Sequence, residues 1–203
     1  MNAIHLLRVT AAGLPAQAGT GPPAGPGGEV TLGLLDELAA ALARQFRVSC
    51  RVCPERLEAA FAFDPARGQY HSTAILQRMA ELAEPDLRLL GVTALDLYVP
   101  VLTFVFGEAQ LEGSCALVSL HRLREEFYGL PASNDLLHER LTKEAVHELG
   151  HTFGLRHCHD WRCVMASAHG VERLDVKTAD FCSACRAAVF VPASPDTAAS
   201  PAA

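Results

Sequence analysis

The chain carries two histidines four residues apart, His147 and His151, followed by Gly154 and a third histidine, His157. On a helix, residues four apart lie one turn above each other, so the first two imidazoles can bind one metal ion from the same face. A glycine can end that helix in a left-handed conformation, after which the chain can turn and bring in the third imidazole. Three histidines on tetrahedral zinc leave one position for water. The spacing therefore predicts an open zinc site.

Glu148 lies directly after the first of these histidines. Zinc lowers the pKa of a bound water toward neutrality, and a carboxylate at this place can take its proton. A His-Glu-x-x-His pattern alone can occur by chance, and the histidines would then be ordinary surface or capping residues of a helix. The continuation through Gly154 to His157 favours the metal site. We therefore expect a catalytic Glu148 and three histidine ligands.

Four cysteines follow without a gap: Cys158 and Cys163, separated by four residues, and Cys182 and Cys185, which form a Cys-x-x-Cys pair. Four thiolates can close a tetrahedral structural zinc site that has no room for water. The alternatives are two disulfides or four unrelated buried thiols, and disulfides require an oxidising compartment. We expect two Zn²⁺ per chain, one catalytic and one structural.

From residue 147 to residue 185 the sequence resembles the archaemetzincins, a family of zinc metallopeptidases in the metzincin clan. Their signature continues the zinc helix with a cysteine, a second cysteine five residues on, a nearby methionine and a final Cys-x-x-Cys. Two upstream segments, 96–100 and 104–109, resemble the same family, so the likeness covers about residues 88–185. The residues that carry it are His147, Glu148, His151, Gly154, His157, Cys158, Cys163, Met165, Asp175, Lys177, Phe181, Cys182 and Cys185.

The resemblance implies a zinc-dependent peptidase in which Glu148 acts as general base toward a zinc-activated water, with a peptide or protein as substrate. It also implies an antiparallel edge strand that lines the cleft, and a tight turn that places Met165 beneath the histidines. Astacin-like metzincins have a tyrosine after this methionine as a transition-state donor, but this chain has none there. Oxyanion stabilisation is then left to zinc or to a residue that the sequence does not identify. The alternative is a zinc-stabilised binding or regulatory protein with little or no turnover.

Hydrophobic periodicity predicts the order strand, helix, strand, helix, strands, zinc helix. This order predicts an α/β (α+β) fold, with a metzincin-like twisted mixed sheet backed by helices and followed by a metal-pinned C-terminal segment. The predicted strands are 4–9, 47–52, 87–99, 103–107 and 116–120, the last two as an antiparallel pair. The predicted helices are 31–46, one capped by Ser72 with Ile75, Met79 and Leu82 on its apolar face, and the zinc helix from Ser133 or Asn134 to Phe153.

Length, charge and hydrophobicity limit the size of the core, the partners that the chain can have and its location. The 203 residues are 50% hydrophobic, which is enough for a sizeable core. A net charge of −6 without a basic cluster argues against nucleic acid as a partner. No hydrophobic run reaches membrane-spanning length, and the first nine residues lack the features of a secretory signal. We expect a cytoplasmic monomer that does not bind membranes.

We expect residues 1–190 to form one catalytic domain, with the sheet and helices in 1–153 and the second zinc site in 154–190. The stretch from 10 to 28 is expected to be a flexible loop and 191–203 a disordered tail, because both are rich in Ala, Pro and Gly or Ser. Cys50 and Cys53 should point to opposite faces of a strand, and Cys115 should lie in the core. Packed aromatic positions are expected for Tyr98 and Tyr128, and surface positions for His5, His71, His121, His138 and His169.

Overall fold

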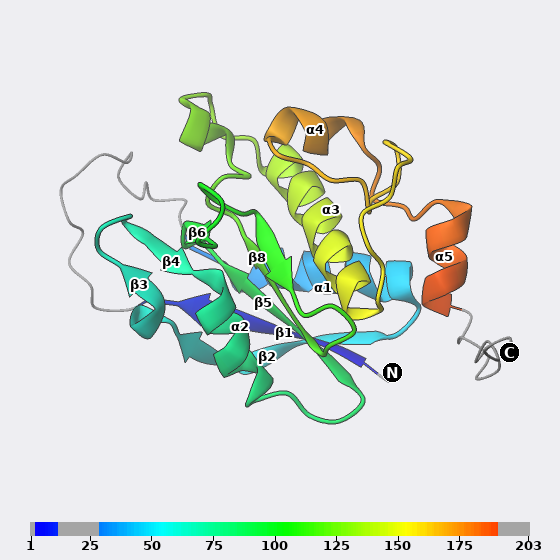
Figure 1. Ribbon diagram of the computed structural model, residues 1–203, viewed down its shortest axis with the longest axis horizontal. Coiled ribbons are helices and arrows are strands. Elements are labelled where there is room, and N and C mark those ends of the chain that lie inside the picture. The colour runs from blue at the N-terminus through cyan, green and yellow to red at the C-terminus, as the bar shows by residue number, and fades with distance from the viewer. Residues whose placement is uncertain (1–2, 12–28, 191–203) are drawn as a thin grey trace, which may run out of the picture.

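The main sheet has five strands in the order β2-β1-β5-β8-β7 (Figure 1). The computed structural model describes residues 3–11 and 29–190, so most of the predicted loop and the whole predicted tail lie outside the described residues. The first four strands are parallel, and β7 pairs antiparallel with β8 at the edge. This arrangement confirms the predicted mixed sheet. The strands are β1 (Ala3–Thr10), β2 (Ser49–Glu58), β5 (Leu87–Thr93), β7 (Gly107–Ala109) and β8 (Cys115–Ser119).

A second, smaller sheet takes up part of the segment predicted as one strand over 87–99. It has the order β3-β4-β6, formed by Phe63–Asp64, Gln69–His71 and Leu97–Tyr98. The prediction of one strand is wrong because the chain bends after Thr93, whose hydroxyl accepts a hydrogen bond from the Leu95 N–H at 3.2 Å. Asp96 then receives two bonds from the Arg122 guanidinium, at 2.7 and 2.8 Å. These contacts direct the chain away from β5 and into the second sheet.

Helices cover both faces of the main sheet. In Figure 1, α2 lies in front of the strands and α1 behind them, and the buried residues of α1 and α3 share one hydrophobic cluster. The Thr31 hydroxyl caps α1 by accepting from the Leu34 N–H at 3.2 Å, so the helix begins one residue after its predicted start. Short 3-10 helices occupy Ala60–Ala62 and Glu125–Tyr128. The α-helices are α1 (Leu32–Phe46), α2 (Ser72–Ala80), α3 (Asn134–Thr152), α4 (Val171–Val176) and α5 (Ser183–Phe190).

The start of α2 differs from its prediction. Ser72 is the first helical residue and not its cap, because its buried hydroxyl donates to the Tyr98 carbonyl at 3.0 Å and also contacts the Glu108 carboxylate. The helix ends at Ala80, so Leu82 lies beyond it and is exposed. The expected apolar face is therefore shorter by one residue.

Two side chains of β2 test the expected alternation. Cys50 packs against the cluster that contains α1 and α3, whereas Cys53 packs against the cluster that contains α2. The two thiols point to opposite faces, as predicted, and Cys115 is fully buried in β8, also as predicted. The surface position expected for His5 is wrong: it is buried in β1, and its Nε2 accepts from the Arg51 Nε of β2 at 2.6 Å.

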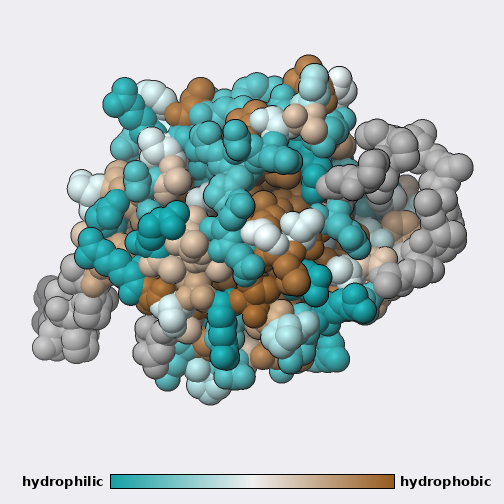
Figure 2. All heavy atoms as spheres, turned by 180° about the vertical axis from the view of Figure 1, so that it is seen from behind, coloured by the Kyte–Doolittle hydropathy of each residue, from teal (hydrophilic) through white to brown (hydrophobic). Residues whose placement is uncertain are grey.

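The surface mixes polar and apolar regions. Seen from the back of the view in Figure 1, hydrophobic residues gather near the centre of the face and hydrophilic residues surround them (Figure 2). Among the described residues, the large hydrophobic side chain with the greatest exposure is Val101, at 89%, just before the stretch that leads into β7. None of the described helices has the length and apolar character needed to cross a membrane.

Leu38→Ala should lower the free energy of unfolding by about 2–5 kcal/mol, because Leu38 is fully buried between α1 and the sheet and its loss leaves a cavity. Leu32→Ala in the same helix, at a side chain that is 55% exposed, should change it by less than about 0.5 kcal/mol. Denaturant unfolding at a fixed zinc concentration measures both. Equal effects of the two substitutions would contradict this packing of α1.

Candidate active site

Helix α3 carries the first two histidines of the predicted zinc site. It begins where the Ser133 hydroxyl accepts from the Leu136 N–H at 3.4 Å, and its residues Leu137, Leu141, Val146 and Leu149 are buried, as predicted. The helix ends before Gly154, which has φ +85° and donates its N–H to the His151 carbonyl at 2.9 Å. Only glycine adopts this φ at little cost. The turn after the helix therefore follows from the sequence.

The structure brings the three predicted histidines together. Ligand nitrogens of His147, His151 and His157 all lie within 4.8 Å of one another. The centroids of their rings are 4.7, 5.3 and 5.2 Å apart. The first two histidines come from one face of α3, and the third comes from the segment after Gly154. The helix spacing and the glycine turn thus produce the predicted cluster.

The hydrogen bonds of two imidazoles show which nitrogens are available to a metal. Nδ1 of His147 is 2.8 Å from the Val164 carbonyl, and Nδ1 of His151 is 2.7 Å from the Leu155 carbonyl. A carbonyl only accepts, so each Nδ1 carries the proton and each Nε2 carries a lone pair. The two Nε2 atoms nevertheless lie 3.1 Å apart. Two lone pairs at this distance repel each other unless a cation lies between them.

That separation fits zinc. Tetrahedral zinc with ordinary Zn–N bonds places two ligand nitrogens about 3.3–3.4 Å apart. Burial also lowers the pKa of all three histidines, most strongly that of His147, and the nearby Lys177 ammonium lowers each of them further. Neutral imidazoles are the form that binds metal. The residues present could therefore hold a zinc ion.

Glu148 is buried beside this cluster and faces β7. An added methyl group on Gly107 would meet the Glu148 side chain at 2.6 Å and the Leu117 carbonyl oxygen at 2.6 Å. The absence of a side chain at Gly107 therefore allows the carboxylate to lie against the edge strand. Burial raises the pKa of Glu148 well above its ordinary value; the neighbouring Glu144 carboxylate adds to this shift and Lys177 opposes it. A carboxylate with a raised pKa is a stronger base than an exposed one.

A cleft of about 550 Å³ opens over the histidines and Glu148. One wall is the stretch from Leu102 to Ala109 that enters and forms β7, and it is largely apolar. The opposite wall consists of Ser167, Ala168 and His169 on the segment after Met165, which we call the cleft wall. Neither predicted packed tyrosine lines this cleft. Tyr98 is buried as expected, but Tyr128 is exposed, contrary to expectation.

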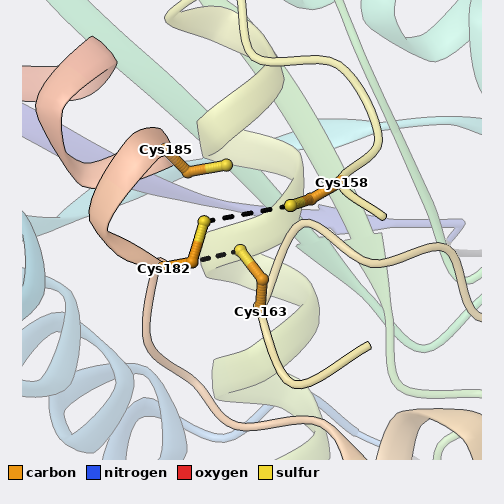
Figure 3. A group of neighbouring side chains, drawn as sticks. All are labelled: Cys158, Cys163, Cys182 and Cys185. Carbon is orange, nitrogen blue, oxygen red and sulfur yellow. Dashed lines mark hydrogen bonds between the residues drawn. The ribbon is translucent and has the colours of Figure 1, made fainter. Parts of the chain in front are cut away.

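The four cysteines form a second cluster (Figure 3). Their sulfur atoms all lie within 4.8 Å of one another, and those of Cys158 and Cys182 are 3.8 Å apart. A disulfide has its sulfurs about 2.05 Å apart, whereas four thiolates on zinc lie about 3.8 Å apart. All four are free cysteines. The spacing fits the expected metal site and not the alternative of two disulfides.

Met165 lies between the two clusters. It is fully buried, and an added methyl group on Gly150 of α3 would come within 2.5 Å of its sulfur. Its carbonyl accepts from the Cys158 N–H at 2.9 Å, and the preceding carbonyl, that of Val164, holds His147. Met165 thus packs against the zinc helix, as the family resemblance implies.

Several residues at the cleft were not identified as site residues from the sequence. Glu144, Arg156 and His169 all line it, although His169 was expected only at the surface. Lys177, one of the residues that carry the family resemblance, bonds to Glu144. For Glu144 a signal was available: it stands three residues before His147, on the helix face that the histidines share. The positions of Arg156 and His169 depend on turns outside the helix, which the spacing of residues does not determine.

An open set of three histidines with a buried glutamate, beside an antiparallel edge strand of a mixed sheet, defines a zinc metallopeptidase of the metzincin type. Comparisons with known proteins agree. The model of peptidase family M54 matches residues 51–189. The chain is 44% identical to the archaemetzincin of Methanocaldococcus jannaschii over 136 residues, which are 67% of this chain and 74% of that protein. It is 38% identical to the archaemetzincin of Pyrococcus furiosus over 79% of this chain and 87% of that one.

Two solved structures are similar over most of their length. The crystal structure of archaemetzincin from Archaeoglobus fulgidus has a TM-score of 0.72 at 32% identity, covering 92% of this chain and 99% of that one. A zinc-dependent peptidase from Methanocorpusculum labreanum has a TM-score of 0.75 at 28% identity, with the same coverage. The chain belongs to peptidase family M54, the archaemetzincins. It is therefore a zinc-dependent peptidase that acts on peptides or proteins.

Gly107→Ala should lower peptidase kcat by roughly 100-fold, because the new methyl group displaces Glu148 or β7 by a distance that costs this much in aligned reactions. It should also lower the free energy of unfolding by about 1–3 kcal/mol through overpacking. Steady-state kinetics and denaturant unfolding measure the two effects. Gly33→Ala is the control, because an added methyl group there has no neighbour within 4 Å. An unchanged kcat for Gly107→Ala would show that Glu148 does not need this close approach.

Proposed function

We propose that the chain hydrolyses peptide bonds with His147, His151 and His157 holding the catalytic zinc and Glu148 acting as general base. The observation that supports this most is the pair of Nε2 lone pairs 3.1 Å apart, because neutral imidazoles do not approach in this way without a shared cation. The third histidine and the buried carboxylate face the same cleft. Together they supply the parts of a metal-assisted hydrolysis.

Each part has a separate role. A zinc ion held by the three histidines would supply Lewis acidity toward the scissile carbonyl oxygen and toward the attacking water. Glu148 accepts the proton from that water and passes it to the leaving amine. The carbonyls of Val164 and Leu155 keep the first two imidazoles in the tautomer that binds metal.

The substrate lies along β7 as an extended chain. The backbones of Phe106 and Gln110, which flank β7, hydrogen-bond toward β8 at 2.8 and 3.0 Å. Alternate residues of an antiparallel ladder face the neighbouring strand, so Glu108 pairs with β8 while Gly107 and Ala109 direct their N–H and C=O groups outward. These groups are free to pair with a peptide backbone. Such pairing is tolerant of sequence, so selectivity must come from the side chains of the cleft.

We further propose that Cys158, Cys163, Cys182 and Cys185 bind a second, structural zinc ion. The 3.8 Å separation of two of their sulfurs supports this. The ion joins the segment after His157 to α5, which otherwise has no buried residue among those described. A closed tetrahedral site of this kind contributes to folding and not to catalysis.

Glu148→Gln should lower kcat/KM for peptide cleavage by roughly 10²–10⁴-fold, the usual contribution of a general base, and should leave zinc content unchanged. Cleavage of a mixed peptide library, followed by mass spectrometry, measures activity, and atomic absorption measures zinc. Glu139→Gln is the matched control, because Glu139 is an exposed glutamate of the same helix.

Retained cleavage by Glu148→Gln would refute the assignment of the base. If the wild-type protein binds a hydroxamate chelator but cuts no peptide of the library, the alternative of a zinc-stabilised binding protein is favoured.

Cys182→Ser should reduce the zinc content from two ions per chain to one and should lower the melting temperature, because metal binding at a closed site is coupled to folding. Cys53→Ser, at a half-buried cysteine outside the cluster, should keep both ions. Metal analysis after dialysis and thermal unfolding measure the two properties. If Cys182→Ser retains two ions and its melting temperature, this cluster is not a zinc site.

A further inference from the structure

Besides Glu148, three charged side chains of the zinc helix are buried. Arg140, Lys143 and Glu144 are 3%, 3% and 4% exposed, although helices of this kind normally keep such residues in water. A buried charge is costly unless it is paired and hydrogen-bonded. Each of the three indeed bonds to one short segment, residues 174–177, which contains the end of α4. The zinc helix therefore holds this segment through polar contacts.

Two of these contacts lie at the far end of the segment from the cleft. Arg140 donates from Nε and Nη2 to the two carboxylate oxygens of Asp175, both at 2.7 Å. Lys143 donates from Nζ to the carbonyls of Leu174 and Asp175, both at 3.2 Å. The geometry of the first pair is bidentate, which fixes direction as well as distance. Together they fix the end of α4 on α3.

The third contact reaches the cleft. Lys177, 3% exposed, donates from Nζ to Glu144 Oε1 at 3.1 Å and to the carbonyl of Ala166 at 3.2 Å. Ala166 stands directly before the cleft wall, residues 167–169. The same carboxylate that holds the ammonium belongs to a cleft-lining residue, Glu144. A single ammonium thus connects the floor of the cleft, on α3, to the start of its wall.

Few hydrogen bonds restrain the cleft wall, although the half-buried Ala168 packs against the main hydrophobic cluster. Ser167 and His169 are exposed, and the interaction between them is a 3.4 Å contact from hydroxyl to imidazole. Among the described residues, no backbone N–H of 167–169 donates a hydrogen bond outside regular secondary structure. The bond from Lys177 to the Ala166 carbonyl therefore restrains the backbone directly before this exposed stretch.

We propose that Lys177 is a positioning residue for substrate binding, which holds the cleft wall at a fixed distance from α3 through Glu144 and Ala166. This inference rests on the proposed function, because it takes the cleft to be the peptide site. Lys177 does not touch the reacting atoms. Its removal should widen or loosen the cleft on the side opposite β7 and leave the histidines and Glu148 in place.

Lys177→Met should raise KM for peptide substrates about tenfold, the factor expected for the loss of a hydrogen bond to a charged group, while kcat changes by less than about threefold. The backbone order parameters of residues 167–169, from ¹⁵N relaxation, should fall from about 0.85 to below about 0.6. Zinc content should not change. Lys177→Arg keeps a charged donor and should restore much of the wild-type KM.

Asp175→Asn is the matched control, because it weakens the bond to Arg140 in the same segment without touching Ala166. It should lower stability but leave KM and the order parameters of the cleft wall unchanged. If Lys177→Met does not fold, the double variant Glu144→Gln/Lys177→Met replaces it, since no lone charge is then left buried. The same rise in KM and the same loss of order are expected for the double variant.

A wild-type KM together with unchanged order parameters in Lys177→Met would overturn the inference. A fall in kcat at constant KM would also overturn it, because the ammonium would then act through its charge on Glu148 and the histidines and not through the cleft wall. The relaxation measurement does not depend on turnover. If the wild-type protein cuts no peptide, the proposed function fails, and the order parameters still decide whether Lys177 holds the wall.

Discussion

Two imidazole nitrogens with lone pairs face each other on α3, and much of the C-terminal half of the molecule is arranged to keep them there. Their orientation comes from backbone carbonyls of Leu155 and Val164, which lie outside the helix and accept from the opposite ring nitrogens. The chain from Gly154 onward must therefore wrap back over the helix for the site to exist. The four cysteines lie on this same stretch of chain, from Cys158 to Cys185. In the proposed function the histidine site therefore depends on the cysteine site, although the two share no residue.

The sequence predicts best what depends on local spacing. The three histidines, the glycine turn and the four cysteines follow from intervals that the helix and the zinc geometry both require. The start of α3 agrees with its predicted capping residue, Ser133, and α1 begins one residue after its predicted start, where Thr31 caps it. The break after Thr93 could not be predicted in the same way. It depends on Arg122, which is distant in the chain and bonds to Asp96 only in the folded structure.

The buried charges on α3 are the part of the site that hydrophobic patterning misassigns. A pattern of polar and apolar residues alone assigns Arg140, Lys143 and Glu144 to the solvent-exposed face of the helix. All three are nevertheless buried. Asp175, the partner of Arg140, and Lys177, the partner of Glu144, lie more than 30 residues later, so nothing local indicates those two pairs. Only the pair of Lys143 with Glu139, four residues earlier, can be read from the spacing. Buried ion pairs add little net stability compared with apolar packing. What they provide here is direction, because the bidentate bond from Arg140 to Asp175 and the bond from Lys177 to Glu144 join α3 to two particular residues of the later segment.

The edge strand and Glu148, the proposed general base, are best understood as one unit. Glu148 can lie against β7 only because Gly107 has no side chain, and the outward N–H and C=O groups of the same glycine are those that would receive a peptide. Gly107 therefore has two effects: it leaves room for the Glu148 carboxylate, and it would align a peptide paired with β7 with that carboxylate. On the other side, the cleft wall has no strand to fix it. The buried ammonium of Lys177 bonds to the Ala166 carbonyl just before the wall. This bond restrains the cleft wall as pairing with β8 restrains β7.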